Sequence, residues 1–351
     1  MLKDYYLNKW KDKDKLCLSF SFYKCYNIIG DSMNELFKKL NLGIITNIEP
    51  VDSSQNSVVK ITTLDNAYLV KQYSKDAIKN ENDLLTRTKQ IDISKVLNSS
   101  GIPTILPIEF DNENFIHYDN KYYLIYNYLE YKTLNSEDLN EYYITTLAQT
   151  LASLHKLNLH YDLPIQYKTI NIDYDTYLNK FSKEDKYKEL YKLMLDNKNK
   201  LTNLINTCNN ILPKLNKDLC ISHNDYKLKN ILWNDEQIYL IDFDASSLSN
   251  PAVSLAESAF ALSRQKGIVN YDFYKLYLTS YLKTYGTLNT NYSEALTCAM
   301  NGKLQWYEYL LSNVDEPNRI DDSISMTKEV LSFIDSIEKL LSIYNNITYR
   351  I

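Results

Sequence analysis

Glycine is scarce in this sequence, with six residues among 351. So few glycines argue against a glycine-rich phosphate-binding loop, whose backbone must approach its ligand closely. No stretch approaches ~18 uninterrupted apolar residues, so we expect no membrane span and no membrane partner. Basic charge is also lacking, since the net charge is −5. Nucleic-acid-binding proteins normally present a basic surface, so we expect no nucleic-acid partner.

Cysteine is present but unpatterned, and its spacing matches neither a metal site nor a disulfide framework. We interpret the five residues as reduced thiols in a cytoplasmic protein: Cys17, Cys25, Cys208, Cys220 and Cys298. The first residues, Met-Leu-Lys-Asp-Tyr-Tyr, lack the apolar core of a signal peptide. Both observations favour a cytoplasmic location.

The first third of the chain has β character. Short β-branched and aromatic runs at 44–48, 57–62 and 67–73 are separated by turn residues, which predicts a three-stranded meander. A helix is expected over 77–99, closed by Gly101 and Pro103. A hairpin over 114–126 turns on Asp-Asn.

After residue 130 the pattern is almost entirely helical, apart from a segment at 219–244. Helices are expected over 137–157, 174–212, 253–265, 271–285, 292–312 and 325–344. Before the meander, 16–22 alternates like a strand and 32–40 resembles a short capped helix. We therefore predict an α+β fold with two lobes: a small antiparallel β lobe at 1–126, with an N-terminal extension, and a larger helical lobe at 127–351.

The most informative segment is His223-Asn-Asp-Tyr-Lys-Leu-Lys-Asn230, followed by Ile-Asp242-Phe-Asp. Phosphoryl transfer from a nucleotide requires one carboxylate to accept the proton of the attacking hydroxyl, and an amide and a second carboxylate to hold Mg²⁺ against the phosphates. Asp225, Asn230 and Asp242 are those groups, in the order and approximate spacing of a kinase catalytic loop and metal-binding strand.

With the small β lobe, the lysine of Leu-Val-Lys71 and the helix ending Leu-Ala-Ser-Leu-His155, this segment resembles the aminoglycoside phosphotransferase/choline kinase-like family over about residues 35–312. The resemblance implies a bilobal kinase-like fold, a nucleotide with Mg²⁺, and a hydroxyl acceptor bound by helices of the second lobe. Ordinary protein kinases fit less well, because the metal motif reads Asp-Phe-Asp and no Ala-Pro-Glu segment follows.

The catalytic and metal roles follow from the motif. Asp225 is expected to be the catalytic base, and Lys227 to neutralise charge on the transferred phosphoryl group, the alternative for Lys227 being a solvated loop lysine. Asn230 and Asp242 offer hard oxygen ligands suited to Mg²⁺. His223 is expected to hold the loop without acting as a base.

On the nucleotide side, Lys71 is expected to pair with the α/β-phosphates. Gln90 occupies the position of the family's partner glutamate, and Asp92 or Glu81 could replace it. Two residues of the glycine-free turn, Ser53 and Ser54, could donate to phosphate.

The segment Asn127-Tyr128-Leu129 is expected to receive the adenine edge through its backbone. The implied cofactors are ATP and Mg²⁺, and GTP stays open because side chains do not read the base. Ser254 stands where the family usually carries aspartate, a departure that bears on the geometry of the catalytic loop.

Four residues are candidates for contact with the acceptor: Asp244, Glu257, Trp306 and Glu308. A tryptophan with carboxylates suits a cation, although helix packing would explain the same residues. The favoured function is therefore a kinase acting on a hydroxyl of a small, amine-bearing molecule: aminoglycoside-type first, then a choline-like amino alcohol, a sugar or homoserine. The alternative is a catalytically degenerate member of the same fold that binds nucleotide or ligand without turnover.

Overall fold

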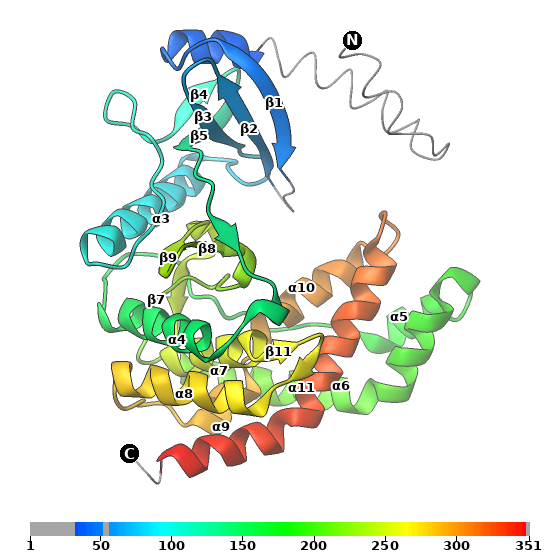
Figure 1. Cartoon of the computed structure of the whole chain (residues 1–351). Coiled ribbons are helices and arrows are strands. Elements are labelled where there is room, and N and C mark those ends of the chain that lie inside the picture. The colour runs from blue at the N-terminus through cyan, green and yellow to red at the C-terminus, as the bar shows by residue number, and fades with distance from the viewer. Residues whose placement is uncertain (1–31, 52–55, 349–351) are drawn as a thin grey trace. The chain divides into compact units, whose positions relative to one another are not determined.

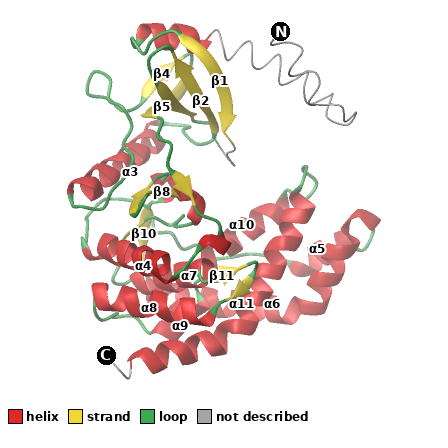
Figure 2. Cartoon of the chain, in the orientation of Figure 1, coloured by secondary structure: helices red, strands yellow, loops and turns green. Residues whose placement is uncertain are grey.

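The structure, a computed structural model, describes residues 32–51 and 56–348. It divides into two compact units (Figure 1). The first unit comprises Met1–Thr88 and Ile105–Glu130, and the second comprises Lys89–Thr104 and Tyr131–Ile351. The mixed α+β class expected from the sequence is confirmed, with an antiparallel sheet in the N-terminal part and helices in the C-terminal part (Figure 2).

The first unit contains a five-stranded antiparallel sheet in the order β1-β2-β3-β5-β4. The bounds of the strands are β1 Ile45–Val51, β2 Ser57–Thr63, β3 Ala67–Gln72, β4 Ile116–Tyr118 and β5 Lys121–Asn127. The expected meander and hairpin are therefore present. A helix over 32–39 supplies Leu36 and Phe37 to a core built with Ile61, Val70 and Ile125. The strand expected at 16–22 lies outside the described residues.

Helix α3 (Glu81–Ser99) carries the chain from the first unit into the second. It ends where expected, because Gly101 adopts a positive φ of 85° and Ile102 donates its N–H to the carbonyl of Leu97 at 2.9 Å. Ile93 and Leu97, in the latter half of the helix, are completely buried in the core of the second unit. This half therefore belongs with the second unit.

The second unit is built from eight helices among the described residues: α4 Glu141–Lys156, α5 Tyr174–Phe181, α6 Lys188–Leu215, α7 Pro251–Leu262, α8 Tyr271–Tyr285, α9 Tyr292–Thr297, α10 Asn301–Ser312 and α11 Arg319–Thr348. Short polar side chains cap five of them by accepting from first-turn N–H groups: Asn140, Asp173, Asn250, Asn270 and Asn291. The asparagine-rich composition thus directly determines where helices begin. No helix in 32–51 or 56–348 is long and apolar enough to cross a membrane.

Two expected helices are each divided in the structure. The helix expected over 174–212 is interrupted between α5 and α6 by a 3-10 turn, Asp185–Tyr187 (η3), where Asp315 accepts from Tyr187 and from Lys186. The helix expected over 292–312 breaks between α9 and α10, where the side chain of Asn301 bonds both the N–H and the carbonyl of Lys168. Tertiary hydrogen bonds therefore overrode helical periodicity in both places.

Short strands in the second unit support the catalytic segment. β6 (Lys132–Thr133), β8 (Ile231–Asn234) and β9 (Gln237–Leu240) form one small sheet. Two pairs complete the β structure: β7 (Cys220–Ser222) with β10 (Ser247–Ser249), and β11 (Arg264–Gln265) with β12 (Ile268–Val269). The loops that leave β7 and β9 carry the catalytic and metal motifs.

Candidate active site

The three expected chemical groups come from two loops that the β8–β9 hairpin brings together. Ile231 pairs with Leu240 across the hairpin, and the next residue, Ile241, donates its N–H to the carbonyl of Asn230 at 3.1 Å. Asp242 follows directly and therefore emerges beside Asn230. His223 crosses the same stem, with its Nε2 2.9 Å from the Ile241 carbonyl.

Asp225 is held at both of its carboxylate oxygens. The Asn230 amide donates to Oδ2 at 2.7 Å and to the Asp225 carbonyl at 2.9 Å, and the Lys227 ammonium contacts Oδ1. Burial by itself would raise the pKa of Asp225, but Lys227, Lys229 and Asn230 together lower it below its ordinary value. The carboxylate is thus ionised and fixed in direction, as a proton acceptor for a hydroxyl must be.

Asn230 and Asp242 have donor sets that fit a hard divalent cation. Asn230 donates both of its amide N–H groups to Asp225, so its Oδ1 faces away from that residue. Among the described residues, no donor contacts Asn230 Oδ1. Asp242 is exposed and has a left-handed backbone, with φ 62° and ψ 66°. Aspartate tolerates this conformation at modest cost, and such strain is concentrated at functional sites. An amide oxygen and a carboxylate are ligands that Mg²⁺ accepts.

The catalytic loop is anchored from beneath by buried groups. The His223 ring lies 4.7 Å from the Phe243 ring, and its Nδ1 accepts from the Asp225 N–H at 3.4 Å. Burial lowers the pKa of His223, so the ring is neutral and serves to position the loop, as expected. Asn224, with φ 55°, donates to Ser247 Oγ at 2.7 Å, and the Tyr226 hydroxyl donates to the Leu147 carbonyl at 2.9 Å.

A buried chain of side chains lies directly behind Ser222, the last residue of β7. The Tyr281 hydroxyl is 2.6 Å from His155 Nδ1, His155 Nε2 is 3.0 Å from Ser222 Oγ, and Ser222 Oγ is 2.7 Å from Ser254 Oγ. Burial lowers the pKa of His155 to about 3, so the imidazole is neutral. Ser254 therefore supports the loop through a hydrogen bond between hydroxyl groups. It does so at the position where the family usually carries aspartate.

Gln90 on α3 has a role that the sequence did not suggest. Its Nε2 donates to the carbonyls of Asp244 and Ser246, each at 2.9 Å. These partners are acceptors, so an amide can bind both, whereas a glutamate would bring a carboxylate against two carbonyl oxygens. The side chain is buried, and it holds the loop that follows Asp242.

A pocket opens beside Asp225 within the second unit. It is small and open to solvent, and is lined by Asn224, Asp225, Tyr226, Lys227, Ser254, Glu257, Ser258, Ala261 and Lys303. Of the predicted acceptor residues, Glu257 lines this pocket. Sequence reasoning missed Lys303, which lies in no motif and is recognised only because the structure places it in the same pocket as Glu257.

The other candidates for acceptor contact lie elsewhere. Among the described residues, Trp306 and Glu308 are not part of the pocket lining. The Arg319 guanidinium lies 5.5 Å from the centre of the Trp306 ring, and Glu308 accepts from the Asn171 N–H at 3.2 Å. Both side chains therefore have contacts within the fold. Asp244 is half-buried in the loop that Gln90 holds.

Of the expected nucleotide-side residues, Lys71 and the segment 127–129 belong to the first unit, whereas Gln90 belongs to the second. Lys71 is on β3, opposite Val58 and Leu124, with its ammonium 5.2 Å from the centre of the Tyr73 ring. At the end of β5, Tyr128 donates its N–H to the Ala67 carbonyl at 2.9 Å.

The flanking residues Asn127 and Leu129 are exposed. Ser53 and Ser54 lie outside the described residues.

Comparison with known proteins identifies the fold. A spectinomycin phosphotransferase, APH(9)-Ia, in complex with ADP and spectinomycin superposes with a TM-score of 0.66 at 16% identity, over 88% of this chain and 98% of that one. Amicoumacin kinase hAmiN gives 0.55 at 14% identity, over 86% and 93%. Choline kinase LicA from Streptococcus pneumoniae gives 0.55 at 15% identity, over 88% and 99%.

No curated protein sequence is significantly similar to this chain. The family is nevertheless established, because a family model described as the phosphotransferase enzyme family matches residues 47–287, more than half of the chain. This match confirms the resemblance drawn from the catalytic segment. The chain belongs to the phosphotransferase enzyme family, and is a small-molecule kinase by class.

Proposed function

We propose that this protein transfers the γ-phosphate of ATP, with Mg²⁺, to a hydroxyl group of a small polar molecule. One observation carries the proposal: Asp225 is ionised, held at both oxygens by Asn230 and Lys227, and opens onto a pocket. A catalytic base for a hydroxyl must be fixed within hydrogen-bonding reach of an approaching acceptor. This arrangement supports that role more directly than a binding function without turnover.

Each group has a distinct task in the proposed reaction. Asp225 accepts the proton of the acceptor hydroxyl and aligns its oxygen for in-line attack. Asn230 Oδ1 and the Asp242 carboxylate would hold Mg²⁺, which when bound neutralises charge on the phosphates. Lys227 places a positive charge beside the reacting oxygen. This charge would neutralise the negative charge that develops on the phosphoryl group during its transfer.

The nucleotide assignment rests on the family and on its solved members. The similar structures include complexes with ADP and, in one kinase, with AMP-PNP and Ca²⁺. We assign Lys71 to the phosphates and the segment 127–129 to the adenine edge. Ser53, Ser54 and Gln90 complete the predicted nucleotide-binding set, with Gln90 acting through the loop it holds.

For the acceptor, we keep the order of candidates that the sequence suggests. An aminoglycoside-type molecule comes first, followed by a choline-like amino alcohol, a sugar or homoserine. Proteins of similar structure act in the same range, since they include a spectinomycin phosphotransferase and a choline kinase. Glu257 is the acceptor contact best supported by position; Asp244, Trp306 and Glu308 are proposed as contacts further from Asp225.

A coupled assay of ATP consumption over an acceptor panel tests this function. Wild-type protein is expected to consume ATP only when Mg²⁺ and a suitable hydroxyl acceptor are present, and Asp225→Ala to lose turnover while retaining a thermal shift with Mg-ATP. Binding of Mg-ATP without consumption over a broad panel would favour the degenerate alternative. Equal turnover by Asp225→Ala would remove this residue from the mechanism.

A further inference from the structure

The pocket beside Asp225 carries charges of both signs. Its charged lining residues are Asp225, Lys227, Glu257 and Lys303, two carboxylates and two ammonium groups. Asp225 and Lys227 are paired with each other. The remaining two, Glu257 from α7 and Lys303 from α10, are the groups available to recognise the rest of an acceptor.

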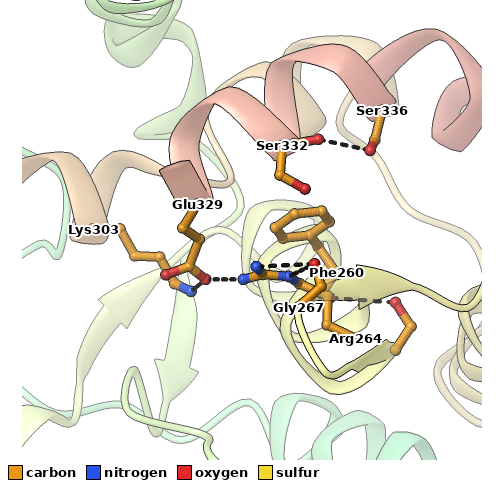
Figure 3. A network of polar contacts seen from close by, with 8 residues as sticks. Phe260, Arg264, Gly267, Lys303, Glu329, Ser332 and Ser336 are labelled. Atoms are coloured by element: carbon orange, nitrogen blue, oxygen red, sulfur yellow. Dashed lines mark hydrogen bonds and ion pairs between the residues drawn. The ribbon is translucent and has the colours of Figure 1, made fainter. Parts of the chain in front are cut away.

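Lys303 is fixed by a charge network behind the pocket (Figure 3). Its ammonium contacts Glu329 Oε1 on α11, and the same oxygen accepts from Arg264 Nη1 at 2.5 Å. Arg264 is itself held by the Gly267 carbonyl at 3.2 and 3.3 Å. The Lys303 side chain is 16% exposed, and Glu329 is its one recorded acceptor among the described residues. Because an ammonium has three N–H groups, it retains donors for a ligand.

Glu257 differs from Lys303 in having no partner within the fold. In the part of the chain that the structure describes, no hydrogen-bond donor or ion-pair partner contacts its carboxyl group. Burial raises the pKa of Glu257 to about 7, although Lys303 and Lys227 act to lower it. A half-buried carboxyl group that lines a pocket and has no donor within the fold can accept hydrogen bonds from a ligand. The wall beside it is Gly302, where a Cβ atom would lie 3.9 Å from Glu257 Oε1.

This charge pattern does not suit an ammonium group. Counting Arg264 and Glu329, three cations face three anions, so the site has no net negative charge with Glu257 ionised and is positive with it protonated. An ammonium at Glu257 would lie near Lys303 and Lys227, both close enough to act on that carboxyl. A hydroxyl group, by contrast, donates and accepts at once, and matches a carboxyl on one side and an ammonium on the other.

We infer that the part of the acceptor next to the phosphorylated hydroxyl is an uncharged, hydroxyl-bearing group, such as the ring of a sugar or cyclitol, which donates to Glu257 and accepts from Lys303. Any amine of the acceptor then lies further from Asp225. This inference rests on the proposed kinase function and deepens it, because it specifies the chemical surroundings of the reacting hydroxyl.

Matched acceptor pairs test the inference. We would compare kcat/KM for glucose with glucosamine, and for myo-inositol with an aminodeoxy-inositol, so that each pair exchanges a hydroxyl for an ammonium. The neutral member is expected to be at least tenfold better in each pair. A preference for the amine member, or turnover of neither neutral member, would overturn the inference.

Variants at Lys303 separate its charge from its packing. Lys303→Met should lower kcat/KM for the neutral members about tenfold and shift the preference towards the amines, whereas Lys303→Arg should keep the neutral preference. Lys339→Met, on the exposed side of α11, is the matched control. Thermal unfolding checks that each variant folds, and if Lys303→Met does not, the arginine variant and the wild-type pairs decide. An unchanged charge preference in folded Lys303→Met would refute the role of Lys303.

The same assay distinguishes this inference from the proposed function. If Asp225→Ala loses turnover of an amine-bearing acceptor that wild-type protein prefers, the kinase function stands and only the inference falls. If Asp225→Ala turns over every acceptor as the wild type does, the proposed function falls with it.

Discussion

Replacing Glu257 by glutamine should stabilise the protein, and only at neutral and alkaline pH. The Glu257 side chain is half-buried, and burial raises the pKa of its carboxyl group from 4.5 to about 7. Below about pH 4.5 it is protonated in both the folded and unfolded states, so it costs nothing. As the pH rises, the unfolded chain ionises first, and the folded state loses relative stability until the folded carboxyl has also ionised.

The magnitude follows from that interval. Between 4.5 and about 7 the free energy of unfolding falls by about 1.4 kcal/mol per pH unit on account of this group, so the full cost is ~3 kcal/mol above pH 7. Glutamine keeps the shape of the side chain without the titration. The variant should therefore unfold a few degrees higher than wild type at pH 8, and at a similar temperature at pH 4.5.

Thermal unfolding of both proteins at pH 4.5, 6 and 8 measures this difference while other titrating groups cancel. Glu338→Gln is a suitable control, because Glu338 is exposed on α11 and its replacement should give no such pH-dependent gain. The unfolding temperatures of the Glu257 and Glu338 variants could instead differ from wild type by the same amount at every pH. In that case the Glu257 carboxylate does not destabilise the folded protein.

Three further outcomes are expected. Gln90→Glu should lower the free energy of unfolding by ~2 kcal/mol, because a buried carboxylate would face two carbonyls; an unfolding midpoint equal to wild type would contradict this. Ser222→Ala and Ser254→Ala should each cost ~1 kcal/mol, and the double variant should cost less than their sum, since they share one hydrogen bond; strict additivity in urea unfolding would argue against the chain. Lys227→Met should raise the pKa of Asp225, so the acidic limb of the kcat/KM profile should move to higher pH; an unmoved limb would separate Lys227 from the base.

Much of the fold followed from local patterns. Alternating β-branched residues at 57–62 and 67–73 gave the paired strands, because one face of each must be buried. The C-terminal end of α3 followed from Gly101, and both ends of α8 followed from a polar cap and a glycine; α3 begins at Glu81, four residues later than expected. Helix breaks between α5 and α6, and between α9 and α10, were not predictable because distant side chains cause them.

The site was predictable to the extent that it is local in sequence. Asp225 and Asn230 are five residues apart, so their direct bond lies within one loop that the motif specifies. Gln90 was identified from its position in the sequence. Its hydrogen bond to Asp244, 154 residues away, could not be predicted, because it depends on the tertiary fold. Lys303 is contributed by a helix without a motif, and its place beside Glu257 depends on how α10, α7 and α11 pack.

Single-turnover transfer of the γ-phosphate from ATP to an acceptor hydroxyl, compared between wild-type protein and Asp225→Asn, tests the central claim most directly. Asparagine keeps the size of the side chain and removes the proton acceptor, so the rate of transfer should fall by about 10²–10⁴-fold while Mg-ATP still binds. An undiminished rate of transfer in Asp225→Asn would contradict the assignment of Asp225 as the catalytic base.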